Sequence, residues 1–113
     1  MNIQDCYCNT CKCHLQYHNV QRNKWKCPTC GNPAFLKVLG KDQYFFQCRY
    51  IPVEDINLGD LIAIEPLRDF IHSVLNVKVM KNQYFVALKD YRPVSYDKGT
   101  LVPVVDGCWD DNY

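Results

Sequence analysis

The chain has 113 residues, of which 48% are hydrophobic, 22% charged and 13% aromatic. These values are ordinary for a small globular domain and exclude an intrinsically disordered chain. The net charge is +1, but residues 1–50 carry a balance of +5 and residues 51–113 a balance of −4. No apolar run approaches the roughly 18 residues that span a bilayer, and the N-terminus lacks a basic and apolar leader. We therefore expect no membrane partner and a cytoplasmic location.

The first feature in chain order is a set of two cysteine pairs, Cys8-Asn-Thr-Cys11 and Cys27-Pro-Thr-Cys30, separated by fifteen residues. Two C-x-x-C pairs at this separation predict one tetrahedral site of four thiolates, which suits Zn²⁺. Because the cysteines are paired at metal-ligand spacing, we expect a reducing compartment and no disulfide scaffold. Four protein ligands close the coordination sphere, so the predicted ion is structural.

The residues around each pair favour a tight turn that aims two sulfurs at one ion. Pro28 presets the first turn residue of the second pair, and Gly31 supplies a positive φ after its last ligand. Lys12 stands at the corresponding place in the first pair, where glycine is commoner. The first turn is therefore expected to be the less ideal of the two.

Neighbouring cysteines and histidines leave two alternatives open. Cys6 or Cys13 could replace Cys8 or Cys11 as a ligand, although the two-residue spacing favours the inner pair. A second metal could be bound by ligands drawn from Cys6, Cys13, His14 and His18. Of the remaining cysteines, Cys48 is expected in the core and Cys108 as a free thiol.

The segment between the two pairs is the candidate binding surface. It is predicted as two short strands, residues 15–19 and 22–26, around a polar tip. Cationic side chains contact phosphates, and aromatic rings stack on unpaired bases. Trp25 and Tyr17 are alternatively expected to pack inward over the metal site or the adjoining barrel. The candidate nucleic-acid-binding residues are Tyr17, His18, Arg22, Lys24, Trp25 and Lys26.

From residue 34 onward the pattern is that of short strands joined by turns. Residues 34–39 and 44–50 flank a hairpin turn at Gly40, and a strand at 61–64 follows the Gly59-Asp60 turn. Later strands are predicted at 70–80, 84–89 and 101–105. In the first of these, we expect alternate residues from Ile71 to Val79 to share one apolar face. A single helical turn is expected within 53–58 or 67–71.

Two resemblances add to this reading. At Cys8-x2-Cys11 and Cys27-Pro-x-Cys30-Gly the chain resembles the zinc-ribbon superfamily, with rubredoxin-like knuckles. Rubredoxin holds iron but has a longer separation, so iron is the less favoured ion. From Ile56-Asn-Leu-Gly59-Asp60 to Tyr84-Phe-Val-Ala-Leu, the chain resembles small SH3-like barrels of the kind seen in phage and mobile-element proteins.

Together these observations predict an all-β protein: a four-cysteine zinc ribbon over residues 1–34, packed on a small β-barrel or sandwich over residues 35–113. No catalytic set is recognisable; His72 is expected on a polar strand face, and the five glycines are too scattered for a phosphate loop. We expect a non-enzymatic, regulatory protein that binds nucleic acid or a nucleoprotein complex, with no small-molecule substrate evident. The alternative is a protein-binding adaptor or inhibitor, for example of a polymerase, nuclease or host-defence enzyme. Its contact surface would be the acidic second half and the tail from Trp109 to Tyr113.

Overall fold

The computed structural model describes residues 3–40, 43–64 and 71–113. Strands predominate, as predicted, and a single helical turn falls within 53–58, while most of 67–71 lies outside the described residues. The described elements are β1 (Ile3–Cys8), β2 (Cys13–His14), α1 (Tyr17–Arg22), β3 (Phe35–Leu39), β4 (Phe45–Pro52), η2 (Val53–Asp55), β5 (Leu61–Ala63), β6 (Ile71–Met80), β7 (Gln83–Leu88), β8 (Val94–Asp97) and β9 (Leu101–Cys108).

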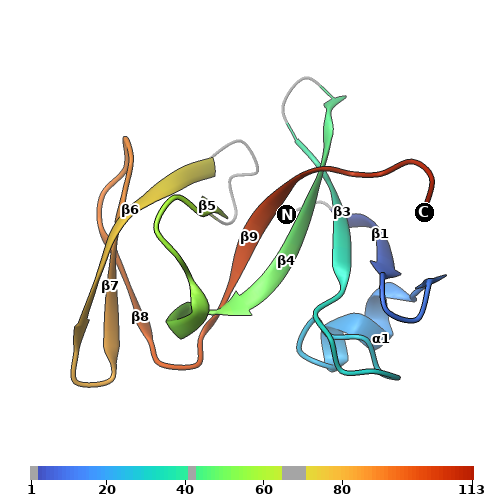
Figure 1. Cartoon of the computed structure of the whole chain (residues 1–113), viewed down its shortest axis with the longest axis horizontal. Coiled ribbons are helices and arrows are strands. Elements are labelled where there is room, and N and C mark those ends of the chain that lie inside the picture. The colour runs from blue at the N-terminus through green and yellow to red at the C-terminus, as the bar shows by residue number, and fades with distance from the viewer. Residues whose placement is uncertain (1–2, 41–42, 65–70) are drawn as a thin grey trace.

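These strands form one antiparallel sheet in the order β2-β1-β3-β4-β9-β5-β6-β7-β8. Figure 1 shows the β6–β7–β8 ribbon at one end and β1 with α1 at the other, on either side of the long strands β4 and β9. The predicted hairpin at Gly40 is confirmed, since β3 pairs with β4. Of the predicted barrel or sandwich, the barrel is wrong: within the described residues β2 and β8 end the sheet, and they do not pair with each other.

The reason is that the β4–β9 ladder separates two cores instead of lining one interior. Cys48 and Tyr50 of β4 face one cluster, which also contains Cys6, Val20 and Leu36. Val102 and Val104 of β9 face the other cluster, with residues of η2, β5, β6 and β7. Successive strand residues point to opposite faces, so one ladder supports a core on each side. The first cluster combines residues from both sides of residue 34. The predicted division of the chain into two domains at that residue stays a prediction.

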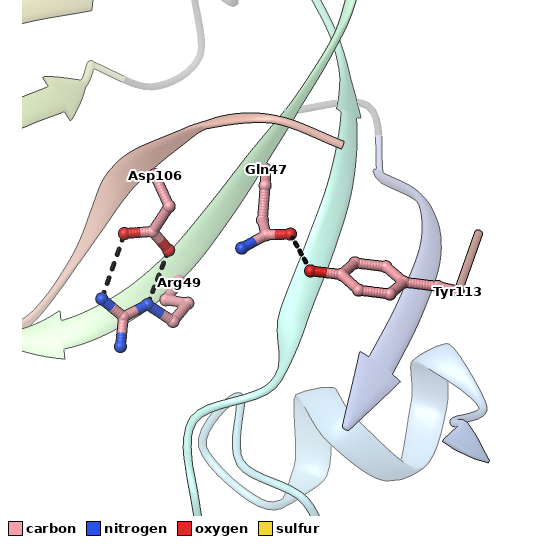
Figure 2. A network of polar contacts seen from close by, with 4 residues as sticks. All are labelled: Gln47, Arg49, Asp106 and Tyr113. Atoms are coloured by element: carbon pink, nitrogen blue, oxygen red, sulfur yellow. Dashed lines mark hydrogen bonds and ion pairs between the residues drawn. The ribbon is translucent and has the colours of Figure 1, made fainter. Parts of the chain in front are cut away.

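A β-bulge in the β4–β9 ladder places a charged pair on its surface. Cys48 pairs with Val105 but Gln47 pairs with Gly107, so Asp106 is the extra residue, and Gly107 has a φ of 105°. Figure 2 shows the result: Asp106 accepts two hydrogen bonds from Arg49, from Nε at 2.6 Å and from a terminal nitrogen at 3.0 Å.

The chain end is fixed by aromatic contacts and one hydrogen bond. The Tyr113 hydroxyl donates to Gln47 Oε1 at 2.9 Å, which Figure 2 also shows. Its ring stacks on Tyr7 with centroids 4.3 Å apart, and Trp109 is only 8% exposed. The aromatic residues of the tail therefore pack on the sheet, whereas Asp110, Asp111 and Asn112 are exposed, and the adaptor hypothesis that uses this tail stays a prediction.

The two strands predicted at residues 15–19 and 22–26 are wrong, because this segment contains α1. The Val20 amide donates to the Gln16 carbonyl at 3.2 Å, and Val20 is fully buried in the first core. One helical turn suffices to bring Val20 under the sheet. The helix ends at Arg22, and in the turn after it Lys24 and Trp25 adopt φ values of 56° and 64°.

The predicted alternation along residues 70–80 is interrupted. Val74 pairs with Leu88 and Asn76 with Ala87, so Leu75 is an extra residue in a bulge. The bulge moves Leu75 out of the apolar face, and it is 57% exposed. Val74 and Val77, three residues apart, face the second core instead. None of the helices described is long and apolar enough to cross a membrane.

Gly40 offers a test of the β3–β4 turn. A Cβ built there would lie 2.7 Å from Phe46 Cε1 and 3.2 Å from the Tyr44 carbonyl oxygen. We expect Gly40→Ala to lower the free energy of unfolding by about 1–3 kcal/mol through overpacking, measured by urea denaturation. In a Phe46→Leu background, which removes the close ring atoms, the cost should shrink. An equal cost in both backgrounds would show that the Phe46 contact is not the cause.

Candidate metal centre

The four predicted ligand cysteines converge at one end of the sheet. Cys8 ends β1, Cys11 lies in the turn that follows, and the second pair follows α1 in the chain. All four sulfurs lie within 4.8 Å of one another. The Cys8–Cys30 sulfur distance is 3.5 Å and the Cys11–Cys27 distance 4.0 Å. A tetrahedron with Zn–S bonds of about 2.3 Å has edges of about 3.8 Å, so the spacing fits one zinc ion.

Each pair adopts the turn that its sequence predicted. The Cys11 amide donates to Cys8 Sγ at 3.3 Å, and the Gly31 amide donates to the Cys27 carbonyl at 2.9 Å. Gly31 has a φ of 77°, and Lys12, at the matching place, has a φ of 55°. The expectation that Lys12 makes the first turn less ideal is thus supported, because a side chain there occupies a region that favours glycine.

The two turns are tied to each other outside the sulfurs. Asn32 Nδ2 donates to Thr10 Oγ1 at 2.8 Å, and Thr10 lies between Cys8 and Cys11. The Asn32 carbonyl accepts from the Cys27 amide at 2.8 Å. Asn32 therefore connects the first turn to the second, in the way that outer groups orient the ligands of a metal.

Burial and hydrogen bonding give Cys11 and Cys27 different acidities. Cys8 and Cys27 are fully buried, whereas Cys30 is exposed. Hydrogen bonding from the backbone of Cys30 lowers the pKa of Cys27 to about 7. Cys11 has a pKa raised to about 12, first because of its hydrogen bond with Cys8. Thiols this close cannot all ionise unaided, and a dication removes that conflict by replacing their protons.

The alternative ligands lie elsewhere. Cys6 is 1% exposed in the first core, and burial, with a smaller contribution from Asp5, raises its pKa to about 11. Cys13 is exposed, and His14 Nδ1 lies 3.1 Å from an Asp5 carboxylate oxygen. Within the described residues, the inner four cysteines form the only group of potential ligands close enough to share an ion. The structure thus favours the inner pairs and gathers no second set.

The residues predicted to bind nucleic acid lie on α1 and on the turn after it. Arg22 and Lys24 are exposed and Lys26 is half-buried. His18 is exposed, and its ring meets Tyr17 edge-on. Their role in nucleic-acid binding stays a prediction.

Trp25 packs inward. This is the second of the two roles that the sequence suggested for it, the first being stacking on a base. Its ring stacks on Tyr50 of β4 with centroids 4.7 Å apart and an interplanar angle of 15°. Tyr17 meets Trp25 edge-on at 5.8 Å and remains 40% exposed. One face of Trp25 is therefore occupied, whereas Tyr17 is accessible.

The sequence reasoning did not predict an open cleft on the other side of Tyr50. It has a volume of about 660 Å³ and is lined by residues from β4, β5, β8, β9 and the segment before β8. Its polar and aromatic members are Tyr50, Tyr91, Arg92, Ser95 and Tyr96. These residues are scattered over almost half of the chain, so no local motif could have revealed them.

Comparison with known proteins returns nothing for this chain. No family model matches it, and neither does any curated protein or any solved structure. The zinc-ribbon and SH3-like likenesses thus stay resemblances, and the site has to be interpreted from its own chemistry.

The two turns make a matched pair of substitutions. We expect Lys12→Gly to raise the free energy of unfolding by about 0.5–1 kcal/mol, because it relieves a positive φ. Gly31→Ala should lower it by about 1 kcal/mol, since no atom lies within 4 Å of the added Cβ and only the backbone is strained. Denaturation at a fixed zinc concentration measures both. A loss of stability in Lys12→Gly would refute the matched geometry.

Proposed function

We propose that Cys8, Cys11, Cys27 and Cys30 hold one structural zinc ion, and that the lobe it organises binds single-stranded nucleic acid. The observation that carries the first part is the convergence of four sulfurs within 4.8 Å. Four thiolates leave no open coordination position, so the ion stabilises the fold and does not activate water. All the cysteines are free, which supports a reducing, cytoplasmic setting.

The charge distribution supports the second part. Residues 6–41 contain no Asp or Glu, and their six basic residues include Arg22, Lys24 and Lys26. Lys37 is less available because its ammonium lies 4.4 Å from the centre of the Phe45 ring. Three of the six, Arg22 at the end of α1 and Lys24 and Lys26 after it, are close together in the chain, where a phosphate backbone meets no opposing carboxylate from this segment.

The conformation of the same turn supports a role for it. Lys24 and Trp25 are consecutive residues with positive φ, and neither is glycine. Such conformations are costly and persist where the surroundings impose them. Here the Trp25 amide bonds to the Val20 carbonyl at 2.8 Å, and the Trp25 ring stacks on Tyr50. Trp25 thus anchors the turn, while its neighbour Lys24 stays exposed.

Single strands fit this surface better than a duplex. With six residues, α1 is short for a helix that reads a major groove. Tyr17 and His18 offer accessible rings next to the cations, and rings beside cations are the usual equipment for unpaired bases. Base stacking is therefore assigned to Tyr17 and His18, and Trp25 is assigned to positioning.

Protein binding is a second candidate because several apolar side chains of the β6–β7 hairpin are exposed. Leu75, Val79 and Met80 of β6 are 57%, 54% and 54% exposed, and Phe85 of β7 is 39% exposed. Exposed apolar residues are a common feature of protein contact surfaces, and here Val79 and Met80 place them on both faces of the hairpin. An adaptor function would then use the β6–β7 hairpin and leave the zinc purely structural.

Metal binding is tested by exchanging one sulfur. The wild-type chain should contain one equivalent of zinc by elemental analysis, and Cys27→Ser should lose it and unfold the N-terminal lobe. Cys13→Ser removes an exposed neighbouring thiol and should keep the full equivalent. Retention of zinc by Cys27→Ser, or its loss in Cys13→Ser, would contradict the assigned ligand set.

Nucleic-acid binding is tested by reversing the three cations together, as Arg22→Glu, Lys24→Glu and Lys26→Glu. Affinity for a labelled single strand at low salt should fall at least about tenfold, and the slope of log affinity against log salt should fall by about 2. The control reverses Lys78, Lys81 and Lys89 on and beside the β6–β7 hairpin, all exposed, with the same change in net charge. Equal losses in both variants, or no binding by the wild type, would refute the proposed surface.

A further inference from the structure

The cleft beside Tyr50 lies where the sheet remains open. Its walls are the edge strand β8 with the preceding residues, the start of β9, the end of β5, and Tyr50 of β4. In the order of the sheet, β8 is the last strand, so the cleft separates it from the β4–β9 ladder to which it is not paired. The failure of the sheet to close therefore coincides with a cavity of about 660 Å³.

The charge of the cleft selects for an anion. Among the described residues that line it, Arg92 is the only charged one. Its side chain is exposed, and the guanidinium carbon lies 5.8 Å from the centre of the Tyr91 ring. A guanidinium beside an aromatic ring, with no carboxylate among the described lining residues, favours a phosphate or a carboxylate ligand.

The rings of the cleft are held in place by contacts behind them. Tyr91 packs against His72 with centroids 4.7 Å apart, and His72 Nδ1 donates to the Lys89 carbonyl at 2.8 Å. Tyr50 is held from behind by the Trp25 stack. Tyr96 packs against the second core, and burial raises its pKa. Rings that are already fixed cost little entropy when a planar ligand stacks on them.

One pair of stacked rings links the cleft to the proposed nucleic-acid surface. Tyr50 lines the cleft and contacts Trp25, and Trp25 lies between Lys24 and Lys26 in the chain. The turn that carries these cations and the cleft are therefore joined through a single aromatic stack.

We propose that this cleft binds one nucleoside phosphate, with the base against Tyr91 and Tyr96 and the phosphate on Arg92. The ligand is either an unpaired nucleotide of the bound strand or a free mononucleotide; the first case rests on the proposed function, and the second does not. Ser95 supplies a hydroxyl that can bond to a base edge or a ribose. An extended peptide added to β8 is less favoured, because this edge is four residues long and follows Pro93.

Two ligands distinguish the sources: adenosine 5′-monophosphate and a labelled single strand of about twelve nucleotides. Amide signals of Tyr91, Ser95 and Tyr96 should shift when the mononucleotide is added. Arg92→Gln should weaken binding of the mononucleotide, and of the strand if the cleft takes its nucleotide, by about tenfold. Lys98→Gln, which removes an exposed cation outside the cleft, should change neither affinity.

A second pair of variants tests the ring. Tyr91→Leu should weaken binding and Tyr91→Phe should restore it, with thermal melting to show that both variants are folded. Unchanged affinity in Tyr91→Leu would remove the stacking role.

Each combination of outcomes has one meaning. In one outcome, reversal of Arg22, Lys24 and Lys26 abolishes strand binding, Arg92→Gln leaves it unchanged, and the mononucleotide does not bind. This outcome overturns the proposal for the cleft and leaves the proposed function intact. Mononucleotide binding that depends on Arg92, without strand binding, supports the cleft and overturns the proposed function. Binding of an extended peptide in the cleft, with no response to the mononucleotide, overturns the nucleotide assignment.

Discussion

Convergence of four thiols is the constraint on which the N-terminal lobe depends. Helix α1 has six residues, too few to persist in water on its own propensity, and Val20 is its only buried residue. The helix is held by what flanks it: the cysteine pairs before and after it, and the stack of Trp25 on Tyr50. The proposed zinc ion, bound to four thiolates, would supply folding free energy on the order of 10 kcal/mol and so compensate for the small core of this lobe.

The β4–β9 ladder transmits that constraint to the rest of the molecule. One face of the ladder carries Tyr50 and Cys48, against the lobe that bears the cysteines, and the opposite face carries Val102 and Val104 against the second core. Tyr50 also lines the cleft, so the residue that receives Trp25 belongs to both proposed binding regions. A displacement of Trp25 in the N-terminal lobe would therefore alter the wall of the cleft, because Trp25 stacks on Tyr50.

Local signals in the sequence were sufficient where local chemistry decides the structure. The spacing of Cys8, Cys11, Cys27 and Cys30 predicted the cluster, and the comparison of Lys12 with Gly31 predicted a less ideal first turn. Features set by distant contacts were missed. The segment around Val20 offered no helical period because α1 is less than two turns long, and the bulge at Leu75 depends on pairing with β7. The closure of the sheet and the cleft beside Tyr50 both depend on the position of β8 relative to β9. No sequence motif specifies that position.

The most direct test of this account is X-ray absorption at the zinc edge of the purified, folded protein. We predict one zinc ion per chain, with four sulfur neighbours at about 2.3 Å and no light-atom ligand in the first coordination sphere. A folded protein without zinc, or a spectrum with nitrogen or oxygen ligands in place of one or more sulfurs, would contradict it.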